Sequence, residues 1–181
     1  TAAEIERVFA ASFADEAHKD GLAVLRSASF PSVAFVDQRS QLLDVMAADQ
    51  GYPLRGTLEL SDASGRPLSS RAPAEGQLYL DHRALVALGV KPGQRIQLGG
   101  RDLTIAAELV RQPDGGELFA LAPRAMMSLA DAQAAGLLGG GSRARHRLLL
   151  AGDPQGVSAW RRWAEGQPLP VAGAVAAEHP L

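Results

Sequence analysis

The residues most able to do chemistry in this chain form one basic run, Arg143, Arg145, His146 and Arg147. Guanidinium and imidazolium groups bind phosphates and carboxylates through charge-assisted hydrogen bonds. The run could therefore hold an anion such as a lipid headgroup phosphate, or contact a partner protein. The alternative is structural, because alternate residues of a strand share a face and charged side chains protect an exposed strand edge from aggregation.

Other catalytic and cofactor-binding patterns are missing from the sequence. The chain has no cysteine, and none of its four histidines lies at a metal-ligand spacing from another. Neither lysine, Lys19 or Lys91, belongs to a phosphate-binding G-x-x-x-x-G-K-[ST] loop. An esterase would need a Ser–His pair, for example Ser142 with His146, but the G-x-S-x-G elbow is absent. The sequence predicts a binding or mechanical module with no metal or cofactor of its own, and not an enzyme.

Length and composition are those of an ordinary globular chain. Its 181 residues are 46% hydrophobic and 21% charged, which suits one domain or two small subdomains. The net charge of −2 leaves no basic excess for binding nucleic acid. No apolar run is long enough to span a bilayer. Because the chain begins with threonine and carries no signal peptide, we expect it to be part of a longer protein.

The elements that must position these residues are predicted from periodicity, turns and caps. Asp81 and Gly89 are typical N- and C-terminal caps of a short helix, and Asp153-Pro154 begins another. Pro92-Gly93 is a turn that leads into a strand. No internal repeat is visible. The expected helices are 2–20, 82–88, 123–135 and one from 154 with Val157, Trp160 and Trp163 on its apolar face. The expected extended segments are 22–25 and 30–36 around a break at Phe30-Pro31, then 57–61, 77–80, 95–98, 102–110 and 147–151. Segment 41–49 is ambiguous between helix and strand, and we assign it as strand. Residues 118–121 are apolar, turns are expected at 62–65, 99–100 and 113–116, and an extended tail follows Pro168.

These patterns indicate an α/β (α+β) fold with helices and strands at both ends and a β-rich middle. We place the borders at the Tyr52-Pro53 turn and at the Gly139–Ser142 glycine run, both of which could act as flexible junctions. One subdomain would then comprise residues 1–50 and 143–181, and residues 51–142 would form a smaller inserted β-rich subdomain.

Two blocks in the middle of the chain resemble a known family. The run Tyr52, Pro53, Leu54, Arg55, Gly56 is similar to the Y-P-L-R-G stretch of bacterial ABC transporter permeases of the MacB/FtsX type, in particular the YbbP-like permeases. The block that contains Asp81, Gly89 and Gly93 resembles the family's L-D-x-R-L…L-G-V-x-x-G-D-x-I pattern, with Gln94 where aspartate is usual. The resemblance extends over roughly residues 30–163.

The resemblance implies a periplasmic domain of a bacterial inner-membrane protein, with the two-part subdomain porter-like. ATP would be bound by a separate cytoplasmic ABC ATPase, and ATP-driven movement would be transmitted to the periplasm, which is called mechanotransmission. It also implies a lipid or other hydrophobic substrate, and a periplasmic thioesterase or lysophospholipase as partner, with no nucleic acid involved. The alternative is a stand-alone binding module, because the L-G-V-K-P-G-Q-R-I-Q-L segment that begins at Leu88 also resembles double-psi barrels and related adaptor domains. An esterase is the less favoured third interpretation.

Overall fold

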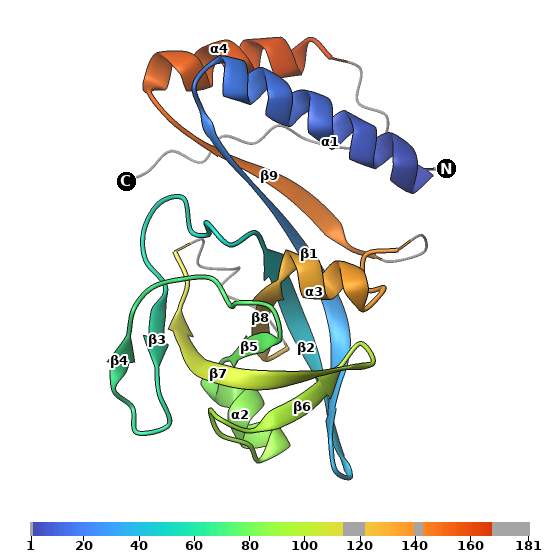
Figure 1. The fold of residues 1–181 in the computed structure, drawn as a ribbon, viewed down its shortest axis with the longest axis vertical. Coiled ribbons are helices and arrows are strands. Elements are labelled where there is room, and N and C mark those ends of the chain that lie inside the picture. Colours follow the sequence, from blue (N-terminus) through green and yellow to red (C-terminus); the bar gives the residue numbers. More distant parts are fainter. Residues whose placement is uncertain (1, 114–121, 140–142, 168–181) are drawn as a thin grey trace. The chain divides into compact units, whose positions relative to one another are not determined.

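The structure is a computed structural model that describes residues 2–113, 122–139 and 143–167 (Figure 1). It has the mixed α/β fold predicted from the sequence. The helices are α1 (Ala2–Lys19), α2 (His82–Leu88), α3 (Leu129–Ala134) and α4 (Pro154–Glu165). The strands are β1 (Ala23–Val36), β2 (Arg39–Ala48), β3 (Glu59–Ser61), β4 (Pro67–Leu68), β5 (Gln77–Leu80), β6 (Arg95–Leu98), β7 (Arg101–Arg111), β8 (Arg124–Ser128) and β9 (Arg145–Ala151).

Six strands close into a barrel. Their order around the ring is β1, β2, β8, β5, β7 and β6, and β6 pairs again with β1. The pairs β2–β8 and β5–β7 are parallel, and the other four are antiparallel. The barrel core contains fully buried apolar side chains from all six strands, among them Ala34, Leu43, Val45, Leu78, Leu80, Leu98, Leu103, Ile105 and Met127. Closure leaves no open edge along the ring, which is how small barrels satisfy their backbone hydrogen bonds.

The barrel consists of two halves with the same order of elements, β1–β2–β5–α2 and β6–β7–β8–α3. In each half, the second strand runs parallel to the third strand of the other half. Asp81 and Ser128 are the equivalent N-caps, and in each half a glycine with positive φ, Gly89 or Gly136, follows the cap by eight residues. The structure therefore contains an internal repeat that we did not predict, because different side chains make the equivalent contacts.

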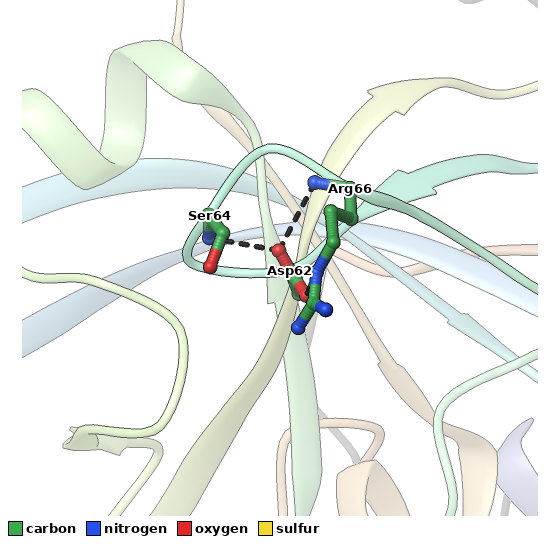
Figure 2. Close-up of polar contacts among 3 residues, drawn as sticks. All are labelled: Asp62, Ser64 and Arg66. Atoms are coloured by element: carbon green, nitrogen blue, oxygen red, sulfur yellow. Dashed lines mark hydrogen bonds and ion pairs between the residues drawn. The ribbon is translucent and has the colours of Figure 1, made fainter.

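A hairpin formed by β3 and β4 extends the sheet beyond the barrel through the pairing of β3 with β7. Its turn is the predicted one at 62–65 and is organised by Asp62 (Figure 2). Asp62 Oδ1 accepts hydrogen bonds from the backbone N–H groups of Arg66 (3.0 Å) and Ser64 (2.7 Å), and Oδ2 accepts one from Arg66 Nε (2.9 Å). These bonds, above all the one from the Arg66 backbone, hold the pKa of Asp62 below its usual value.

Tyr79 lies on the outer face of β5, where it is only 2% exposed. Its neighbours in the sheet are Met126 on β8 and Ala107 on β7. Burial raises the pKa of the Tyr79 phenol, although a hydrogen bond from Arg71 acts in the opposite direction.

This raised pKa predicts a loss of stability in alkali. Since the folded chain holds the Tyr79 proton more tightly than the unfolded chain, the contribution is complete below the ordinary tyrosine pKa of about 10 and declines as pH rises through the folded value. Urea unfolding at about pH 8 and about pH 11 should show a larger loss for the parent chain than for Tyr79→Phe. The other tyrosine, Tyr52, remains in that variant as an internal reference for absorbance titration. Equal losses in the two proteins would contradict the assignment.

A second compact unit packs around two tryptophans. Its buried core is Phe13, Ala17, Leu22, Trp160 and Ala164. The Phe13 ring meets Trp160 and Trp163 edge-on, with centroids 5.8 and 5.0 Å apart, and Trp160 Nε1 donates to the Phe13 carbonyl oxygen (3.0 Å). The predicted apolar face of α4 and its Asp153 cap are confirmed, since Asp153 accepts from the N–H groups of Gln155 and Gly156.

The chain divides into a helical unit, Thr1–Val24 with Leu148–Leu181, and a barrel unit, Leu25–Arg147. These borders differ from the expected ones, because β2 pairs with β1 and β8 and so holds residues 25–50 in the barrel unit. The expected junctions at Tyr52-Pro53 and Gly139 both lie inside that unit, and residues 140–142 are outside the described part of the chain. The connections between the units are β1 and β9, which pair with each other.

Two local predictions were wrong. The expected break at Pro31 is absent, because the fixed φ of proline fits an extended strand, and Pro31 pairs opposite Asp44 in continuous β1. The expected helix 123–135 begins only at Leu129, because residues 124–128 form β8 between β2 and β5. The ambiguous segment 41–49 is strand, as predicted. The apolar segment 118–121, the end of the 113–116 turn and the tail after Pro168 lie outside the described residues.

Candidate functional site

The first block of family-motif residues, Tyr52 to Gly56, maintains the fold at the positions whose contacts are described. Tyr52 is 2% exposed, Pro53 and Leu54 are half-buried, and Arg55 is exposed. Gly56 has φ of 71°, and a Cβ there would come within 2.7 Å of Pro113 Cβ. Both its left-handed conformation and this close approach require glycine.

The second block, Asp81, Gly89 and Gly93, also maintains the fold. Asp81 caps α2 by accepting from the Ala84 N–H (2.8 Å), and Gly89 ends the helix in a left-handed conformation with the Arg39 guanidinium directly against it. Gly93, with φ of 98°, donates its N–H to the Ile105 carbonyl oxygen at 2.7 Å. The structure therefore gives these motif residues roles as caps and turns.

The basic run lies where β9 begins. Arg145, His146 and Arg147 are the first three residues of β9, and Arg143 precedes the strand by two residues. All four side chains are exposed. Because successive strand residues point to opposite faces, Arg145 and Arg147 share one face and His146 projects from the other. The structure thus places three of the four predicted contact residues on one exposed strand segment, with the fourth two residues before it.

The charge of this segment is not neutralised by the described part of the chain. Elsewhere in the barrel unit, Arg26 pairs with Asp49, Arg66 with Asp62, Arg101 with Asp131 and Arg111 with Glu59. In contrast, the side chains of Arg143, Arg145, His146 and Arg147 make no hydrogen bond or ion pair with another described residue. They are therefore available to an anionic ligand or partner.

A second surface feature is an apolar patch on the β1–β2 hairpin. Val33 and Leu42 lie directly opposite each other in the register, and Phe35 follows Val33 on the same face. Their exposed fractions are 38%, 50% and 50%, respectively. Sequence reasoning missed this patch because residues 33–36 are all apolar, so alternation could not show which face would be outside.

The described residues show no arrangement of side chains for the other sites considered from the sequence. Ser142, the proposed partner of His146 in an esterase, is outside the described residues. Among the residues that the structure does describe, no group of three histidine, aspartate or glutamate side chains could hold a metal ion. Within the same residues, no helix is long and apolar enough to cross a membrane.

This fold occurs in the extracellular domain of an ABC-type transporter. The crystal structure of the extracellular domain of the noncanonic ABC-type transporter YknZ from Gram-positive bacteria matches with a TM-score of 0.54, over 81% of this chain and 76% of that chain, at 10% sequence identity. In sequence, the chain is 33% identical over 150 residues to a protein of Escherichia coli strain K12, the uncharacterized ABC transporter permease YbbP. That match covers 82% of this chain and 18% of the permease, so the chain spans less than a fifth of the length of this relative. No family model matches the chain. The predicted resemblance to ABC transporter permeases is confirmed.

Proposed function

We propose that the chain is a non-catalytic periplasmic domain of a bacterial inner-membrane ABC transporter permease of the MacB/FtsX type. It transmits movement driven by a separate cytoplasmic ATPase to a lipid or other hydrophobic substrate, or to a periplasmic partner such as a thioesterase or lysophospholipase. The observation that carries the proposal is the 33% identity to a permease over 82% of the chain. ATP would be bound by the ATPase subunit, and this domain would need no cofactor.

The division of the chain supports a mechanical role. Helices α1 and α4 pack in one unit, so the chain enters and leaves the described fold through the same unit. The barrel unit is joined to it by β1 and β9, each of which continues from one unit into the other. Movement of the helical unit would thus reach the barrel through two paired strands.

The apolar patch of Val33, Phe35 and Leu42 supports a hydrophobic substrate. A monomeric soluble domain normally covers large side chains, and neighbouring exposed ones are typical of a surface that contacts something apolar. In this chain they share one face of a hairpin that belongs to the barrel. A hydrophobic ligand at this patch would be in direct contact with the unit that receives the movement.

The mechanical proposal predicts an ATP-dependent change within this domain. The chain has no cysteine, so the exposed positions Ser40 on β2 and Gln155 on α4 can be replaced by cysteine and spin-labelled in the full-length permease with its ATPase. We expect the label-to-label distance distribution to shift when ATP is added. The matched control has both labels in the barrel unit, at Ser40 and Ser64, and should not shift. Identical distributions with and without ATP for the Ser40–Gln155 pair would contradict mechanotransmission through this domain.

A further inference from the structure

The start of β9 combines unneutralised charge with a strand edge that no other described strand pairs with. Arg145, His146 and Arg147 are exposed on both faces of the strand. Among the described strands, β9 pairs with β1 alone, so its other edge carries no strand. Unpaired N–H and C=O groups on a strand edge are a template for pairing with another chain.

We propose that the start of β9 binds an extended acidic segment of a partner protein, which adds to the free edge of the strand. This inference deepens the partner role in the proposed function. The added strand would place alternate carboxylates on the same face as Arg145 and Arg147, whose Cα atoms are about 6.6 Å apart in extended backbone. Alternate residues of an acidic strand have the same spacing, and oppositely charged neighbours across a strand pair stabilise it.

This geometry favours a peptide over a lipid headgroup. Phospholipid phosphates would interact with the arginines but would make no use of the strand edge. Protection of the edge against aggregation by charge alone is the structural alternative. It requires positive charge but no complementary binding partner, so the two explanations differ in a binding experiment.

The test measures binding of a fluorescein-labelled Glu-Val-Glu-Val-Glu-Val peptide to the whole chain by fluorescence polarisation. We expect binding that weakens with salt, and at least about tenfold weaker binding by the R143E/R145E/R147E variant. The matched control, K91E/R95E/R162E, makes the same change in net charge at three exposed cations outside the basic run, and its affinity should stay within about threefold of the parent. Methylation of the peptide's backbone N–H groups, which blocks strand pairing but keeps the carboxylates, should also weaken binding.

Three outcomes would overturn the inference. Equal losses in the two triple variants would show attraction by net charge alone. Binding of phosphatidylglycerol vesicles without binding of the peptide would identify a membrane surface instead. Aggregation of R143E/R145E/R147E, with no peptide binding by the parent chain, would show edge protection. Circular dichroism checks that both variants fold. None of these outcomes affects the spin-label experiment, so the failure of this inference and the failure of the proposed function can be told apart.

Discussion

Replacing Trp160 by alanine is expected to lower the free energy of unfolding of the helical unit by about 3–5 kcal/mol, the usual range for deleting a large buried aromatic side chain. Trp160 is 7% exposed and belongs to a core with four other buried members. Its ring packs edge-on against Phe13, and its Nε1–H satisfies the Phe13 carbonyl oxygen. The alanine variant loses all these contacts and leaves a cavity in a small core that has few neighbours able to fill it.

Hydrogen exchange of the two units is the appropriate measurement, because local unfolding of one unit can precede global unfolding. In Trp160→Ala we expect faster exchange of the α1 and α4 amides, with the barrel amides little changed. Trp160→Phe keeps most of the ring contact but loses the hydrogen bond to Phe13, so its effect should be about 1–2 kcal/mol. Arg162→Ala, at an exposed position on the same helix, should change stability by less than about 0.5 kcal/mol. Unchanged exchange of α1 and α4 in Trp160→Ala would contradict the described packing.

Replacing Asp131 by alanine is expected to destabilise the barrel unit by about 2–4 kcal/mol. This carboxylate is 2% exposed and accepts hydrogen bonds from the Gly76 N–H (2.7 Å) and from Ser128 Oγ (2.8 Å). Its Oδ1 lies 3.4 Å from an Arg101 terminal nitrogen. Asp131 therefore links α3, the segment that leads into β5, and the first residue of β7. Without it, the Gly76 N–H has no acceptor in a part-buried setting, and the cost of leaving such a group unsatisfied dominates the effect.

Hydrogen exchange of the barrel amides measures this loss, because tryptophan fluorescence would report on the other unit, which contains both tryptophans. Asp131→Asn keeps an acceptor oxygen for Gly76 and should lose about half as much stability as Asp131→Ala. Asp102→Ala removes an exposed carboxylate from β7, the strand that begins with Arg101, and is the matched control, with an expected change below about 0.5 kcal/mol. A loss for Asp131→Ala no larger than that of the control would show that the buried carboxylate is not needed for stability.

The candidate surfaces were only partly predictable. The basic run was identified from residue type alone, but its position on an exposed strand with a free edge depends on which strands pair. The motif residues were recognisable as a block, although their roles as caps and turns appeared only in the backbone geometry. The apolar patch could not be predicted, because an uninterrupted apolar run does not reveal which of its side chains face the core.

The sequence by itself determined the local features of this protein. The Asp81 and Asp153 caps, the Gly89 helix end and the turn at 62–65 depend on one residue's own backbone preferences and on bonds to near neighbours in the chain. Only the tertiary structure decided the closure of the barrel, the strand at 124–128 and the borders of the two units. Each of these rests on pairing between segments far apart in the chain, and a strand's stability comes from the partner that it meets and not from its own residues.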